Sequence, residues 1–166
     1  MSKVKLKPVR KPREILEVSG LAHTVWREHY AGIVAQEQIE YMLEKFQSAA
    51  AIGQAIAEGY EYYVISRLGT PAGYIAVKPN EPAGKMFVSK IYLLSDFRGK
   101  GLAFDTIEQI AEMCKRQRLT AIWLTVKKDN PSVGRYEKIG FAITREIVTD
   151  IGNGFVMDDY VMEKNV

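Results

Sequence analysis

The chain has 166 residues, 47% of them hydrophobic, and a formal net charge of +3. This length suits one domain over residues 1–166, and this composition excludes a disordered chain. The charge is too small to indicate nucleic acid as a partner. No apolar run approaches the roughly 20 residues of a membrane-spanning helix, so we expect no membrane partner either.

Cysteine usage bears on the compartment. The chain has one cysteine, Cys114, so no disulfide can form within it, which fits a reducing compartment. His23 and His29 have no cysteines at zinc-type spacing, and we expect no metal. The N-terminus also lacks the apolar core of a signal peptide. These features predict a cytoplasmic protein.

The first thirteen residues carry six cations and no acids. Within them Val4 and Leu6 alternate with lysines, which predicts a strand over residues 4–9 whose lysines point to water. The alternative interpretation is a basic arm for an anionic partner.

Apolar residues at helical spacing follow this strand. They predict one helix over residues 11–32, opened near Pro12, and a second over residues 35–48. Residues 49–59 are expected to extend the second helix by a turn or two and to end it at Gly59.

From residue 60 the hydrophobic pattern changes to that of strands. Strands are predicted over residues 60–68, 73–79 and 85–94, separated by the turns GTPAG and NEPAG. Turns this short connect antiparallel neighbours.

The rest of the chain predicts, in order, a helix from about Gly101 to Gln117, an apolar strand over residues 119–126, a short helix over residues 130–140, and paired strands over residues 141–148 and 154–164. The order is therefore β-α-α-β-β-β-α-β-α-β-β. The helix from Gly101 joins its two neighbouring strands by a crossover, so these strands should be parallel. We expect an α/β (α+β) fold with a mixed seven-stranded sheet and helices on both faces.

The segment Arg98–Gly101 places two glycines and two cations directly before a helix. A helix start presents unpaired N–H groups and a partial positive charge, which suit an anion. Gly99 and Gly101 allow close approach and positive φ, so that successive N–H groups can form a nest. These features predict a phosphate or pyrophosphate site, and a surface turn with solvated cations is the alternative. Neither a Walker A loop nor a dinucleotide fingerprint fits, because Phe104 stands where the last glycine of the fingerprint is due.

This segment, Arg98-Gly99-Lys100-Gly101-Leu102-Ala103, resembles the Arg/Gln-x-x-Gly-x-Gly/Ala signature of the GNAT acetyltransferase superfamily. It lies where that family has it, between the fourth strand and the following helix. A second signature of the family is matched by Asn130, Tyr136, Lys138, Gly140 and Phe141. The order of elements also matches over nearly the whole chain.

The resemblance implies acetyl-CoA as acetyl donor. In the family the loop amides hold the pyrophosphate, which here assigns Phe97, Arg98, Gly99, Lys100, Gly101, Leu102 and Ala103 to the coenzyme. The preceding strand splays from its parallel neighbour, so that backbone groups at Tyr92, Leu93 and Leu94 would bond the pantetheine. An N–H at this gap would also polarise the thioester carbonyl.

Tyr136 is the expected catalytic acid. In the family the matching tyrosine points at the coenzyme sulfur, and a phenol can protonate a leaving thiolate because its pKa lies close above that of a thiol. The alternative is that Tyr136 packs or orients. Asn130 is expected to bond backbone or coenzyme, and an N-cap or Asx turn before Pro131 explains it equally well.

The general base is left open by the sequence. The strand over residues 85–94 has no carboxylate, where many relatives place a glutamate. Ser89 or Tyr92 could order a water chain, and Glu37 or Glu40 could border the acceptor mouth, although exposed helix glutamates are usually just solvated.

Two other reactive side chains have structural explanations. Cys114 falls on one helical stripe with Ile107, Ile110 and Ala111, which predicts a buried thiol rather than a nucleophile. His29 could line the acceptor pocket or act as base, and plain packing or exposure is favoured.

The family places its acceptor beside the N-terminal helices. Trp26 and Tyr30 there offer π surfaces that suit a cationic amine, although ordinary core packing also explains Trp26. Asp158 and Asp159 near the C-terminus could attract a polyamine. This last segment, and the spacing Trp26…Tyr30…Gln38…Tyr41, loosely resemble bacterial spermidine/diamine N-acetyltransferases.

These interpretations favour an N-acetyltransferase that moves an acetyl group from acetyl-CoA to a small amine acceptor by direct attack. One alternative is a peptide or protein N-acetyltransferase. Another is a CoA-binding regulatory module without turnover, which the missing strand carboxylate favours and the intact Tyr136 disfavours. A homodimer is compatible with the family resemblance.

Overall fold

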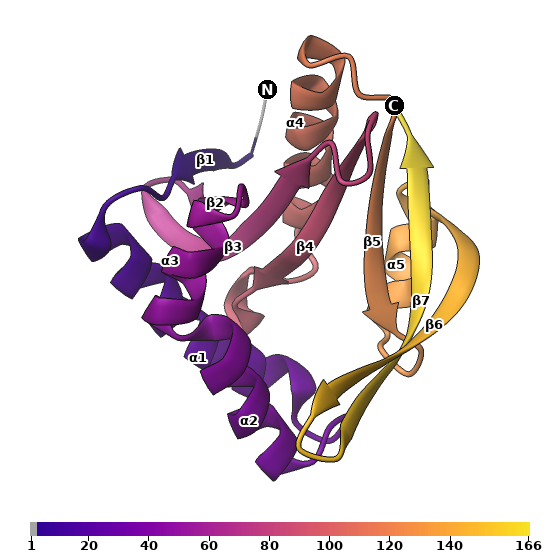
Figure 1. The fold of residues 1–166 in the computed structure, drawn as a ribbon. Helices are drawn as coiled ribbons and strands as arrows, with labels where there is room; N and C mark the ends of the chain where they lie inside the picture. The colour runs from indigo at the N-terminus through magenta and orange to yellow at the C-terminus, as the bar shows by residue number, and fades with distance from the viewer. Residues whose placement is uncertain (1–2) are drawn as a thin grey trace. The chain divides into compact units, whose positions relative to one another are not determined.

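The computed structural model describes residues 3–166 (Figure 1). In chain order its elements are β1 (Lys5–Pro8), α1 (Pro12–Tyr30), α2 (Gln36–Gln47), α3 (Ala49–Ala57), β2 (Glu61–Arg67), β3 (Thr70–Pro79), β4 (Lys85–Leu93), the 3-10 helix η1 (Ser95–Phe97), α4 (Leu102–Arg116), β5 (Ala121–Lys127), α5 (Ser132–Lys138), β6 (Ala142–Gly152) and β7 (Phe155–Asn165).

The strands of the described residues form one seven-stranded sheet in the order β1-β2-β3-β4-β5-β7-β6. β4 and β5 are parallel, and their register joins Lys85–Val88 to Ala121–Leu124. The pairs β1–β2, β2–β3, β5–β7 and β6–β7 are antiparallel. This confirms the mixed α/β sheet and the parallel strands that α4 connects.

The expected second helix is in fact two helices. Ser48 has extended backbone angles (φ −69°, ψ 157°) between α2 and α3, and its Oγ accepts a hydrogen bond from the N–H of Ala51 at 3.1 Å. Ser48 therefore caps a new helix instead of continuing the old one. The order of elements gains one helix, and the expectation of continuous turns after residue 48 is wrong.

The strand predicted from residue 73 begins earlier, at Thr70. Arg67 pairs with Thr70, so the β2–β3 turn contains two residues, Leu68 and Gly69, both with positive φ (49° and 82°). Two-residue turns of this hand match the twist of a hairpin. Because Leu68 gives no turn signal, the sequence suggested a longer turn over GTPAG.

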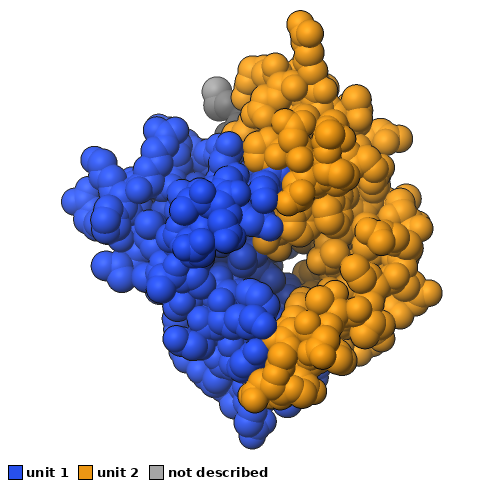
Figure 2. Space-filling model, viewed as in Figure 1, with its two compact units in different colours: residues 1–78, 90–109 blue, residues 79–89, 110–166 orange. Residues whose placement is uncertain are grey.

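The chain divides into two compact units, each made of two separate stretches (Figure 2). Unit 1 contains the chain up to Lys78 and Lys90–Gln109, and unit 2 contains Pro79–Ser89 and Ile110–Val166. The boundaries therefore fall inside β4 and inside α4.

The core of unit 1 lies where α1 packs on the β2–β3 part of the sheet. The indole Nε1–H of Trp26 donates to Tyr74 Oη on β3 at 3.0 Å, and Val18, Ile52 and Ile75 are fully buried. Each such aliphatic side chain contributes about 1.5–3 kcal/mol when it leaves water. Val4, which directly precedes β1, is buried, and Lys5 and Lys7 of β1 are exposed, as the alternation predicts.

Unit 2 buries apolar side chains of β5 and of the second half of α4. Ile110, Cys114, Ile122 and Leu124 are all at most 2% exposed. Burial raises the pKa of the Cys114 thiol to about 11, so the thiolate form is scarce at neutral pH. The prediction that Cys114 is a core residue is confirmed.

Within residues 3–166 no helix has the length and apolar character needed to cross a membrane.

Candidate functional site

The loop before α4 adopts the backbone conformation that its glycines predict. Gly99 and Gly101 have φ of 75° and 77°, and a Cβ at Gly99 would meet nothing within 4 Å. The N–H groups of Phe97 and Arg98 already donate to carbonyls of the preceding turn, at 2.9 and 3.2 Å. An anion at this loop would therefore be held by the amides from Gly99 to Ala103, the last of which lie in the first turn of α4.

The side chain of Arg98 turns back into the protein. Its Nε donates to the carbonyl of Leu93 at 3.1 Å, and its Nη2 lies 3.8 Å from Glu28 Oε1. Glu28 in turn accepts from the N–H and the hydroxyl of Ser95, at 3.1 and 3.0 Å. Arg98 and Glu28 therefore fasten the turn to α1, which no local sequence pattern could indicate.

The residues just before β1 bring a further cation, Lys3, to the loop that carries Lys100. The main-chain N–H groups of Lys3 and Val4 donate to Asp105 Oδ2 of α4, at 2.6 and 3.0 Å. Lys3 Nζ donates to the carbonyl of Lys100 at 3.3 Å and lies 3.4 Å from where a Cβ on Gly101 would be. The sequence places Lys3 on a solvated strand face, so its position beside Lys100 is a finding of the structure.

Five side chains of unit 1 form a hydrogen-bonded aromatic cluster. The hydroxyls of Tyr30 and Tyr92 lie 3.0 Å apart, and the Trp26 ring packs against both, at centroid distances of 4.9 and 5.4 Å. Tyr74 accepts from Trp26 and donates to Gln47 Oε1 at 3.0 Å. Trp26 and Tyr30 are 3% and 8% exposed, so both are core residues here, and Tyr30 also joins α1 to the strand segment expected to border the coenzyme.

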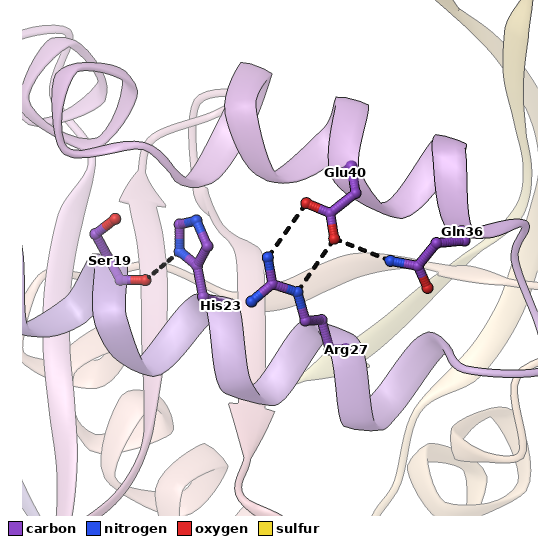
Figure 3. Close-up of polar contacts among 5 residues, drawn as sticks. All are labelled: Ser19, His23, Arg27, Gln36 and Glu40. Carbon is purple, nitrogen blue, oxygen red and sulfur yellow. Dashed lines mark hydrogen bonds and ion pairs between the residues drawn. The ribbon is translucent and has the colours of Figure 1, made fainter.

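The candidate base Glu40 is occupied by a surface ion pair (Figure 3). Arg27 donates to both carboxylate oxygens, at 3.1 and 3.2 Å, and Gln36 donates to Oε1 at 2.9 Å. The hydrogen bond from the Arg27 guanidinium lowers the pKa of Glu40, which makes it a poor proton acceptor. The other glutamate considered, Glu37, is exposed on α2.

β3 and β4 approach each other closely at Gly73. A Cβ on Gly73 would lie 2.0 Å from the carbonyl oxygen of Tyr92 and 2.9 Å from the Cα of Leu93. The N–H of Leu94 donates to the carbonyl of Ala72 at 2.8 Å. The backbone of the expected pantetheine segment, Tyr92 to Leu94, is therefore positioned by contact with a residue that has no side chain.

In unit 2 the second signature forms a turn and the short helix α5. Asn130 is 5% exposed, and its Oδ1 accepts from the N–H of Ser132 at 2.8 Å, which is an Asx turn at the start of α5. Tyr136, on α5, packs edge-on against Phe141 at 5.6 Å between centroids. Asn130 thus has a structural role that explains its burial, and Tyr136 is held in orientation by its neighbour.

The two adjacent aspartates of β7 lie in different environments. Asp158 is exposed and pairs with Lys128 at 3.0 Å. Asp159 is 3% exposed, its Oδ1 has no hydrogen-bond partner in the part of the chain that the structure describes, and burial raises its pKa to about 6. The sequence predicts that either aspartate could attract a polyamine, because it gives no indication of which carboxylate is buried.

Comparisons with known proteins bear on this loop and this fold. A model of the acetyltransferase (GNAT) family matches residues 20–141, which include the loop, Asn130 and Tyr136. No protein with a curated description matches the sequence significantly.

Solved structures with the same fold include the PaiA N-acetyltransferase from Thermoplasma acidophilum in complex with coenzyme A, which is 20% identical with a TM-score of 0.80 over 100% of both chains. A spermidine N-acetyltransferase SpeG chimera from Vibrio cholerae and hSSAT is 18% identical, with a TM-score of 0.70 over 99% of this chain and 96% of its own. Ard1 from Thermoplasma volcanium is also 18% identical, with a TM-score of 0.70 over 99% and 98%.

Proposed function

The chain belongs to the GNAT acetyltransferase family and is an acetyl-CoA-dependent N-acetyltransferase, and from this premise we propose that its acceptor is a small polyamine-like primary amine. The observation that carries the assignment to acetyl transfer is the glycine loop before α4, within the region that the family model matches. Acetyl-CoA supplies the activated acyl group, and the residues of this chain bind and orient it and move the protons.

The residues around the loop fit the phosphates of the coenzyme. The amides from Gly99 to Ala103 would hold the pyrophosphate, and Lys3 and Lys100 would add positive charge beside it. Gly99 supports this role because no Cβ narrows the approach, and a side chain there would be strained at its positive φ. The backbone from Tyr92 to Leu94 would bond the pantetheine as an added strand.

Tyr136 would donate the proton that the departing thiolate needs. We expect the change Tyr136→Phe to lower turnover about a hundredfold or more, because a positioned general acid contributes about 10²–10⁴-fold. The dissociation constant of coenzyme A should stay the same. Stopped-flow turnover and calorimetry measure the two quantities, and Tyr63→Phe, which removes a hydroxyl bonded to Glu61, is the control. Unchanged turnover across the pH range would remove the assignment.

The acceptor is proposed because two parts of this chain resemble those of enzymes that acetylate polyamines. The C-terminal strand and the spacing of residues in the N-terminal helices resemble those of spermidine/diamine N-acetyltransferases, and a spermidine N-acetyltransferase chimera shares the fold. The second candidate, which the sequence leaves open, is a peptide or protein acceptor.

One assay tests the function and separates the candidates. The protein is incubated with acetyl-CoA and with diamines, polyamines, simple amines and peptides, and released thiol is measured. We expect thiol release above background with polyamines. Release with peptides alone would move the acceptor to the second candidate, and no release with any acceptor would favour a CoA-binding module.

A further inference from the structure

We propose that Asp159 binds the ammonium group of the acceptor and takes the first proton from it. This inference rests on the proposed function, which leaves the group that activates the amine without an assignment. Asp159 belongs to unit 2, as does the proposed acid Tyr136.

Asp159 is a buried carboxylate, and one of its oxygens lacks a hydrogen-bond donor among residues 3–166. It lies on β7, between β5 and β6, with Lys127 opposite it in one register and Ile147 in the other. The residue is 3% exposed, and Oδ1 has no hydrogen-bond partner among the described residues. Native proteins rarely leave a buried polar atom unsatisfied, because its desolvation is uncompensated, so each such atom calls for an explanation, and a cationic ligand is one that suits a carboxylate oxygen.

The charged groups around Asp159 do not fully neutralise its carboxylate. Lys127 is the titratable group that faces it from β5, Ile147 from β6 carries no charge, and Asp158 is its neighbour on β7. Lys127 Nζ lies 3.3 Å from Asp129, so its charge is shared with another carboxylate. Burial therefore outweighs Lys127 and raises the pKa of Asp159 to about 6. At neutral pH roughly nine-tenths of the carboxyl is ionised, as an anion that an ammonium group could pair with.

The neighbouring Asp158 cannot take this role. It is exposed and already pairs with Lys128, which also pairs with Glu146. An incoming amine would have to compete with a lysine that is already in place. Its adjacent position and equal charge make Asp158 the matched control for Asp159.

The backbone connects Asp159 to the start of α5 by a short route. Lys127, opposite Asp159, is the last residue of β5, and its carbonyl accepts from the N–H of Asn130 at 2.9 Å. Asn130 then opens α5, which carries Tyr136. The proposed proton acceptor and the proposed proton donor are thus both tied to the carboxyl end of one strand.

The proton transfers balance in this scheme. Asp159 takes one proton from the bound ammonium, which leaves a neutral amine that can attack the acetyl carbon, and it later releases this proton to solvent. The C–N bond forms and the C–S bond breaks. Tyr136 donates its proton to the sulfur and regains one from the nitrogen. The amine loses two protons in all, the thiol gains one, and one appears in solution.

The test compares Asp159→Asn, Asp159→Glu and Asp158→Asn with the wild type, with spermidine as the probe. kcat/KM for acetyl transfer is measured from pH 5 to 9, and calorimetry gives the dissociation constants of spermidine and of coenzyme A. For the wild type we expect kcat/KM to rise with pH through about 6, where Asp159 ionises.

Asp159→Asn should lose this rise, lower kcat/KM about a hundredfold or more, and weaken spermidine binding about tenfold, with coenzyme A binding unchanged. Asp159→Glu should keep the rise at a shifted pH, and it serves in place of the asparagine variant if that variant does not fold. Asp158→Asn should stay within about threefold of the wild type.

Three results overturn the role of Asp159: no rise near pH 6 in the wild type, an unchanged profile in Asp159→Asn, or equal losses in the two asparagine variants. These outcomes differ from a failure of the proposed function. A wild type that releases no thiol with any amine contradicts the function, whereas an active Asp159→Asn variant contradicts the role of this residue alone.

Discussion

The ionised carboxylate of Asp159 lowers the stability of the fold. Its pKa rises from 3.8 to about 6 on burial, so the folded chain holds this proton more tightly than the unfolded chain does. The free energy of unfolding therefore falls as pH rises from about 4 to about 6, and the loss persists above that range. A shift of this size corresponds to an effect on the order of 3 kcal/mol.

A stability measurement tests this linkage independently of activity. Asp159→Asn removes the ionisation, so its stability relative to the wild type should increase between pH 4.5 and pH 7.5. Urea titrations at the two pH values measure the difference. Asp158→Asn loses an exposed ion pair and should show no such increase. A relative stability of Asp159→Asn that does not change with pH would contradict the burial of a charged carboxylate.

For single residues, some features of the loop and of the buried charges were predictable from the sequence and others were not. The positive φ of the loop glycines was predictable because a local motif requires it, whereas the catalytic role of Tyr136 stays a prediction. The inward turn of Arg98 onto Glu28 and the burial of Asp159 were not, because both depend on residues far away in the chain. Lone charges carry no periodic signal that distinguishes a solvated side chain from a buried one.

Among the elements, the segment before β1 does more than lead into an edge strand, because Lys3 contacts the loop before α4. We expect Lys3→Gln to raise the dissociation constant of coenzyme A about fivefold at low salt, the equivalent of about 1 kcal/mol for one exposed cation. The effect should shrink at high salt, since the charge is screened. Calorimetry at two ionic strengths measures both values.

Lys7→Gln provides the control, because Lys7 is an exposed lysine of β1, four residues further along the chain. If the two variants bound coenzyme A equally well at low salt, the contact of Lys3 with the loop would have no part in binding.

The close approach of β3 and β4 gives a second test among the elements. Gly73→Ala should lower the free energy of unfolding by at least about 2 kcal/mol and weaken coenzyme A binding, because the new methyl group would push against the backbone of Tyr92 and Leu93. Denaturant titration and calorimetry measure the two effects.

The matched glycine is Gly20, exposed on α1, where an added Cβ would meet nothing within 4 Å. Gly20→Ala should stabilise the protein by about 0.5–1 kcal/mol, as in other helix interiors. A Gly73→Ala variant that behaved like Gly20→Ala would show that β4 can move away without cost.

Element boundaries were predictable wherever the hydrophobic period was long and uninterrupted, as in α1, α4 and β5. The predicted boundaries were wrong at Ser48 and at Leu68, where the conformation of one residue decides whether a helix or a strand ends. Ser48 could have been recognised as a cap, because serine is a preferred N-cap residue. Leu68 could not, because leucine rarely adopts the positive φ that its turn requires.

For the molecule as a whole, we propose that residues 1–166 fold as a single domain although they form two compact units. The boundaries lie inside β4 and α4, so unfolding one unit would cut short a strand and a helix that the other unit needs. We expect one cooperative thermal transition, with coincident curves from circular dichroism and from tryptophan fluorescence.

Fluorescence can report on both units, because Trp26 lies in unit 1 and Trp123 in unit 2. Replacing each tryptophan in turn by phenylalanine assigns the signal to one unit. Two separate midpoints in these variants would contradict a single domain.

The division inside β4 and α4 also has a consequence for synthesis on the ribosome. Unit 1 is complete when Gln109 has been added, and unit 2 requires the chain to its last residue, Val166. Neither unit has all of its residues while the first hundred emerge from the exit tunnel, but helices α1 to α3 and strands β2 and β3 have all been made by residue 79, so the core of unit 1 can begin to form long before unit 2 is made.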